Sequence, residues 1–96
     1  MPTYDDDHAR RALAKLIDIG AGSLAGGSYE IQDDGEFVLL TTHTTSDMSK
    51  PELAKLCDRI KERLSSDLPE RKGSYGWMVI LRRHDGWIVD SVMPDM

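Results

Sequence analysis

The sequence predicts a single α+β domain in which two helices pack on one face of a four-stranded sheet. Two segments have the apolar spacing of a helix, and each precedes a pair of apolar segments divided by an Asp-Gly turn. The length of 96 residues suits one domain and is too short for two. The expected order of elements is therefore α-β-β-α-β-β in a single domain over residues 1–96. Within it, residues 1–4 are expected to form a disordered tail. This order is shared by many unrelated domains and identifies no family.

The first helix is predicted over residues 6–19. The aspartates Asp5-Asp6-Asp7 suit its start, because carboxylates cap free N–H groups and oppose the positive end of the helix dipole. Gly20 suits its end, where a left-handed residue is common. Residues 20–28 are rich in glycine and are expected to form a flexible linker. A phosphate-binding loop is a weaker interpretation, because this segment follows a helix and contains no lysine. The apolar residues with helical spacing are Ala9, Ala12, Leu13, Leu16 and Ile17.

A β-hairpin is predicted next, over residues 28–42. Asp34-Gly35 is a favoured type I′ turn, in which both central residues have positive φ. This turn would place Ile31 opposite Val38 and Tyr29 opposite Leu40 on the face that packs against the core.

The second helix is predicted over residues 50–65. Ser49 and Glu52 form a capping box, in which the serine hydroxyl caps the Glu52 N–H and the carboxylate reaches back to Ser49. Met48 and Leu53 occupy the two positions of a hydrophobic staple. The apolar stripe of this helix consists of Leu53, Leu56, Cys57, Ile60 and Leu64.

A second hairpin is predicted over residues 75–93, with Asp85-Gly86 as another type I′ turn. Both of its faces would be strongly apolar, whereas a sheet covered on one side should be apolar on one face only. One face would carry Trp77, Val79, Leu81, Ile88 and Val92. The other would carry Met78, Ile80, Trp87, Val89 and Met93, together with Arg82. We therefore expect that one face of this hairpin needs a partner.

Charge and composition exclude several classes of protein. The net charge of −5 disfavours binding to nucleic acid or to an anionic membrane, because phosphates attract Lys and Arg. No apolar run approaches the roughly 20 residues of a membrane span, and the acidic start lacks the apolar segment of a secretory signal. A single cysteine fits a reducing compartment, so we expect a cytoplasmic protein.

Residues capable of site chemistry are sparse. His8, His43, His84 and Cys57 do not fall at metal-ligand spacings, so no metal and no cofactor are expected. Cys57 lies on a buried stripe, where a thiol has a raised pKa and is inert. We therefore expect no catalytic residues and no enzyme.

The second hairpin suggests the function. We expect a protein-interaction domain that acts as an inhibitor or adaptor on a protein partner of unknown identity, and that also forms a homodimer. The alternative is a nucleic-acid-associated accessory protein that uses Arg82, Arg83, Trp77 and Trp87. The expected protein interface consists of Met78, Ile80, Arg82, Trp87, Val89 and Met93.

Overall fold

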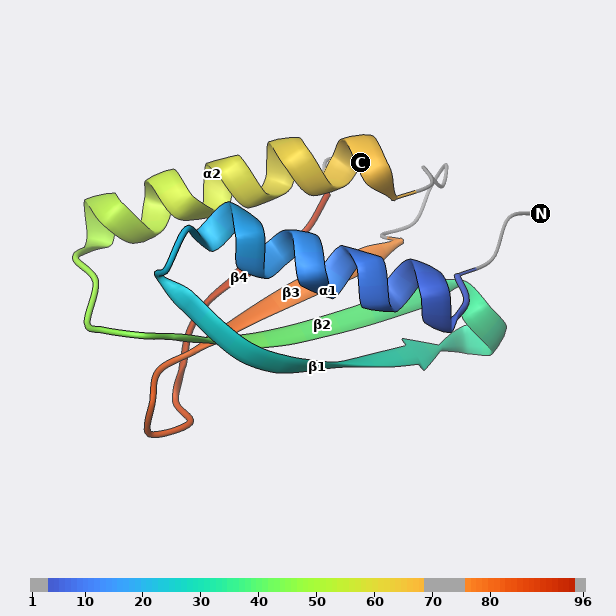
Figure 1. Ribbon diagram of the computed structural model, residues 1–96, viewed down its shortest axis with the longest axis horizontal. Coiled ribbons are helices and arrows are strands. Elements are labelled where there is room, and N and C mark those ends of the chain that lie inside the picture. The colour runs from blue at the N-terminus through green and yellow to red at the C-terminus, as the bar shows by residue number, and fades with distance from the viewer. Residues whose placement is uncertain (1–3, 69–75, 95–96) are drawn as a thin grey trace.

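Two helices cover one face of a mixed four-stranded sheet (Figure 1), so the predicted α+β fold and element order are confirmed. The structure is a computed structural model that describes residues 4–68 and 76–94. The helices are α1 (Asp6–Gly20) and α2 (Lys50–Asp67). The strands are β1 (Leu24–Gln32), β2 (Phe37–Thr44), β3 (Trp77–Arg82) and β4 (Ile88–Val92).

The strands lie in the order β1-β2-β3-β4. The two outer pairs are antiparallel hairpins, and the central pair of β2 and β3 is parallel. Parallel neighbours need a long crossover connection, which here contains α2. This crossover places α2 on the same face of the sheet as α1 (Figure 1).

The core lies between the helices and the two central strands. Val38 and Leu40 on β2 and Val79 and Leu81 on β3 are fully buried and alternate with partly exposed residues. The helices bury Leu16, Leu56, Ile60 and Leu64 against them. Burying one such side chain contributes about 1.5–3 kcal/mol, so these residues hold the two layers together.

The start of α1 is capped as predicted, but the preceding tail is shorter. The Asp5 carboxylate accepts the His8 N–H at 2.9 Å, which lowers the pKa of Asp5, and His8 Nδ1 accepts the Asp5 N–H at 3.3 Å. Tyr4 is 3% exposed, and its N–H donates to the carbonyl of Gly35 at 2.6 Å. The expected disordered tail is therefore wrong at Tyr4, because its aromatic ring packs into the core. Residues 1–3 lie outside the described residues.

The glycine-rich linker predicted for residues 20–28 is also wrong over most of its length, because β1 begins at Leu24. Gly26 and Gly27 form a bulge within this strand, with φ values of 66° and 142°. The buried Thr42 hydroxyl donates to the Gly26 carbonyl at 2.8 Å and so satisfies the bulged backbone. A Cβ atom at Gly27 would collide with the carbonyl oxygen of Thr41.

The first hairpin has the predicted register. Ile31 pairs with Val38 and Tyr29 pairs with Leu40. Asp34 and Gly35 have φ values of 55° and 89°, the positive values that a type I′ turn requires. The predicted register is therefore confirmed, but the connection is longer than the predicted two residues: Asp33 also has a positive φ of 53°, and a short 3-10 turn (Asp33–Gly35) with Glu36 joins β1 to β2.

The second helix begins at the predicted cap and ends two residues later than predicted, at Asp67. The Ser49 hydroxyl oxygen accepts the Glu52 N–H at 3.4 Å. The carboxylate of Glu52 accepts the Ser49 hydroxyl at 2.9 Å, and not the Ser49 N–H as the predicted capping box required.

The second hairpin has a different turn from the predicted one. Its register agrees with the prediction at Val79–Val92, but it shifts by one residue so that Arg82 pairs with Ile88. In the described turn Gly86 has a positive φ of 93° and Asp85 does not, so the connection has three residues and not two.

This shift exchanges the faces of two side chains. Val89 is the extra residue of the bulge and packs against the core, whereas Ile88 is 55% exposed. The predicted faces of Ile88 and Val89 are therefore reversed, because one additional residue in a strand moves the next side chain to the other face.

The bulge in β1 gives a stability test. Gly26→Ala should lower the free energy of unfolding by about 1 kcal/mol, because the residue keeps a positive φ in open space. Gly27→Ala should cost at least about 1 kcal/mol more, because its Cβ also meets the Thr41 carbonyl. Urea unfolding of the two variants checks this order, and equal losses would contradict the bulge geometry.

Candidate functional site

The sheet face turned away from the helices has no covering layer in the part of the chain that the structure describes (Figure 1). Alternation along the strands places large apolar side chains on this face, and all of them remain partly or largely exposed. Neighbouring strands bring them together, for example Leu39 beside Met78. We call this surface the open face, and its apolar members are Phe37, Leu39, Met78, Ile80, Ile88 and Met93.

Exposure is greatest at the end of the open face next to the β3–β4 turn. Trp87 is 70% exposed and Ile88 55%, whereas Met93, after the far end of β4, is 36% exposed. These are the large hydrophobic residues that stand out as exposed among residues 4–68 and 76–94. A hollow of about 520 Å³ lies here, lined by Arg82, Asp85, Gly86, Trp87 and Ile88. A tryptophan, an isoleucine and an arginine thus share one surface depression.

The structure brings most of the predicted interface residues together. Met78, Ile80 and Arg82 lie partly exposed on β3, with Met93 at the border of the open face and Trp87 in the adjoining turn. Val89 faces the helices, and Ile88 takes its place on the open face. An Asp-Gly pair occurs in both two-residue and three-residue turns, so the sequence holds no signal that separates them.

Charged side chains border the apolar centre of the open face on two sides. Glu30 on β1 lies beside Leu39. His43 on β2 lies beside Arg82 on β3, and the Arg82 guanidinium donates one hydrogen bond to the Gly86 carbonyl at 2.7 Å. The open face therefore carries a carboxylate at the β1 side and the Arg82 guanidinium at the end next to the β3–β4 turn, where Asp85 is paired with Arg83.

The other residues of the nucleic-acid hypothesis are not placed on this surface. Trp77 is 2% exposed and belongs to the core, so it has no free ring on which a base could stack. The Arg83 guanidinium donates to both carboxylate oxygens of Asp85, at 2.6 and 3.1 Å. This hydrogen bonding lowers the pKa of Asp85 to about 2 and raises the pKa of Arg83. The predicted stacking role of Trp77 is wrong, and Arg83 is already paired within its own turn.

Cys57 faces an acidic residue of the sheet. Its thiol is half-buried and donates to the Asp90 carboxylate at 3.4 Å. Burial, and then this carboxylate, raise the pKa of the Cys57 thiol to about 12. The thiol therefore stays protonated at neutral pH and is a poor nucleophile.

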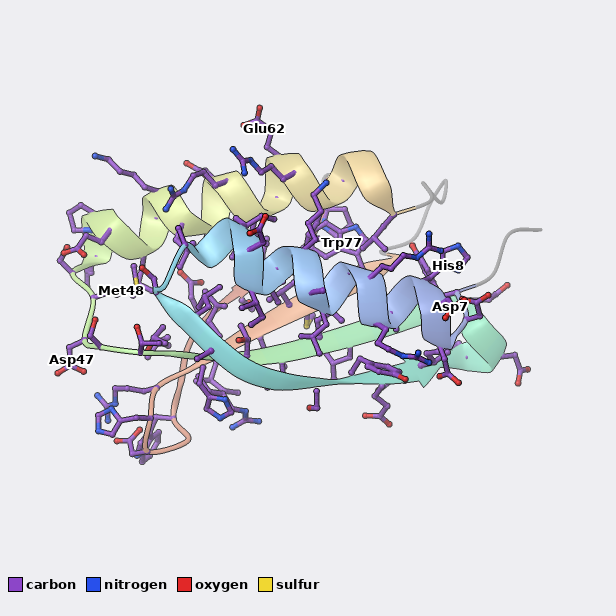
Figure 2. All side chains as sticks on the ribbon, viewed as in Figure 1. Asp7, His8, Asp47, Met48, Glu62 and Trp77 are labelled. Atoms are coloured by element: carbon purple, nitrogen blue, oxygen red, sulfur yellow. The ribbon has the colours of Figure 1, made fainter. Side chains whose placement is uncertain are left out.

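A second and smaller hollow of about 190 Å³ lies beside the start of α2. Met48 and Leu53, the two residues of the predicted staple, line it together with Val89. Asp47 and Arg83 form charged parts of its rim, and Figure 2 shows Asp47 and Met48 at this end of the molecule.

Within residues 4–68 and 76–94, no group of three or more His, Cys, Asp or Glu residues is placed to hold a metal ion. Over the same residues, neither helix is long and apolar enough to cross a membrane. Comparison with protein-family models, curated proteins and solved structures finds no match to this chain.

The Cys57–Asp90 contact gives a pH test. The thiol has an ordinary pKa of 9.0 and a folded pKa of about 12, so the folded protein keeps a proton that the unfolded chain loses. This contribution to stability is present below pH 9 and is lost as the pH rises toward 12. Urea unfolding at increasing pH should therefore show a steeper loss of stability in the wild type than in Cys57→Ala. Equal slopes would mean that the thiol titrates normally.

Proposed function

We propose that this chain is a small, non-enzymatic protein-docking domain that acts as an inhibitor or adaptor by covering a site on another protein. The observation that carries the proposal is the open face, an apolar sheet surface with Trp87 70% exposed at its end. Trp, Met and Arg are enriched in the cores of protein interfaces, and Trp and Arg are frequent hot-spot residues. The open face carries Met78 and Arg82, and Trp87 adjoins it in the hollow at the β3–β4 turn.

The extent of the open face supports the same proposal. Single exposed apolar residues are common, but contiguous apolar patches on monomeric proteins are usually small. Here the apolar residues span three neighbouring strands, and Leu39–Met78 are adjacent in the register. A protein partner would remove this continuous surface from water and gain about 25 cal/mol for each Å² of apolar area.

The arrangement of the reactive side chains favours binding over catalysis. Cys57 is held as a protonated thiol against Asp90, and Arg83 is paired with Asp85. The Cys57–Asp90 contact joins α2 to β4, and the Arg83–Asp85 pair lies within the β3–β4 turn. A free thiol at Cys57 fits a reducing compartment, so the proposal places the protein in the cytoplasm.

A nucleic-acid-associated role is the second candidate, and one observation favours it. Arg82 and Trp87 line the same hollow, where a base could stack beside a cation. The burial of Trp77 and the net charge of −5 weigh against it. The salt dependence of binding separates the two candidates, because only the nucleic-acid contact should weaken steeply with salt.

Site-specific photo-crosslinking in the native cell tests the docking proposal. A photoreactive aromatic residue in place of Trp87 should yield a covalent adduct, because the proposed partner covers this position. The same residue in place of Glu62, an exposed residue on the outer side of α2 (Figure 2), is the matched control and should yield none.

The mass of the adduct identifies the kind of partner. A mass of twice 10.8 kDa indicates a second copy of the chain, and another mass indicates a different protein. Absence of any adduct at Trp87, or equal adducts at both positions, would contradict a docking role for the open face.

A further inference from the structure

We propose that a second copy of this chain covers the open face, in a twofold dimer in which Glu30 of each copy meets Arg82 of the other. This inference rests on the proposed docking function and names its partner. A twofold interface uses the same patch on both copies, so the patch must be complementary to itself.

The open face is a regular grid of side chains. Across the sheet, Glu30 lies beside Leu39 and Met78 in one row. Two rows further along the strands, His43 lies beside Arg82 and Ile88. The intervening row consists of Ser28, Thr41, Ile80 and Ser91.

Glu30 and Arg82 are therefore diagonal neighbours across this grid. They are two strands apart at about 4.8 Å for each strand, and four residues apart at about 3.3 Å for each residue. These steps separate them by roughly 16 Å, and the midpoint lies at Thr41 on β2. The opposite charges thus lie symmetrically about Thr41.

A twofold axis through this midpoint, in the plane of the interface and perpendicular to the Glu30–Arg82 line, exchanges the two positions. It places Glu30 against the partner's Arg82 and also Arg82 against the partner's Glu30. The same rotation brings Leu39 near the partner's Ile80 and Ile88 near the partner's Phe37. One operation therefore matches charge with opposite charge and apolar side chains with apolar side chains.

The resulting arrangement of sheets is a known one. The strands of the two copies would cross at about 70°, which is close to the near-orthogonal class of sheet packing. The open face measures roughly 20 Å by 20 Å from the strand spacing and the rise per residue. An area of this size buries several hundred Å² for each copy, which approaches the roughly 800 Å² per partner of a standard interface.

The distribution of charge also favours this surface for self-association. The net charge of −5 makes two copies repel each other. Acids at the start of α1 (Asp5–Asp7) lie on the helix side, away from the open face, whereas those of the β1–β2 turn (Asp33–Glu36) lie beyond its Phe37 end. On the open face, Glu30 is balanced by Arg82, so repulsion between copies is smallest there.

Charge exchange tests the proposal. Sedimentation velocity should give wild-type protein a mass of twice 10.8 kDa. Glu30→Arg and Arg82→Glu should each weaken the dimer by about tenfold or more, because like charges then meet across the interface. The double variant should restore the dimer, because it exchanges the two charges and keeps both pairs.

Matched controls make the same charge changes on the outer helix. Glu62→Arg and Arg59→Glu lie on exposed positions of α2 and should leave the dimer unchanged. Circular dichroism monitors folding, because Arg82→Glu also removes the hydrogen bond to the Gly86 carbonyl. If Arg82→Glu fails to fold, sedimentation of Glu30→Arg alone tests the proposal. Glu30 is exposed, so its replacement should leave the fold intact and still dissociate the dimer.

Three results would overturn the proposal. They are a wild-type monomer at the highest concentration reached, a dimer that Glu30→Arg does not weaken, and a folded double variant that remains dissociated. A monomer that still forms a Trp87 adduct of foreign mass would refute the dimer and leave the docking function standing. A dimer without any Trp87 adduct and insensitive to both substitutions would refute both.

Discussion

The parallel pairing of β2 with β3 is the constraint on which the rest of the structure depends. A parallel pair cannot be joined by a short turn, so the chain crosses over through α2 before β3 begins. That crossover places α2 beside α1 on one face of the sheet (Figure 1). α1, which precedes β1, packs on the same face, so no helix remains among the described residues to cover the other face. Because both helices lie on one face of the sheet, that face forms the core and the opposite face is left open.

Local sequence signals predicted much of the fold. The Asp34-Gly35 pair indicated the register in which Ile31 faces Val38, and Ser49 marked the start of α2. Each signal reflects a local backbone requirement, a positive φ at the turn or a capped N–H at the start of the helix. The strand order could not be predicted, since it depends on contacts between segments that are distant in the sequence.

The errors of prediction have physical causes in particular residues. Gly26 and Gly27 indicated a linker because glycine permits a positive φ in loops and in bulges alike. Asp85-Gly86 permits turns of two or three residues, and the longer turn exchanged Ile88 for Val89 on the open face. The composition of the second hairpin therefore predicted that one of its faces would be apolar and exposed. Which residues lie on that face could not be predicted, because it depended on one additional residue in β4.

In the proposed dimer a second copy of the chain covers the open face. The most direct measurement is the NMR broadening of methionine methyl signals by a soluble paramagnetic probe, in the wild type and in Glu30→Arg. Met78 and Met93 should be protected in the wild type and broadened in the variant, because the variant is dissociated. Met48 lies on the helix side in the smaller hollow and should broaden equally in both. Equal broadening of Met78 and Met93 in the two proteins would contradict the account.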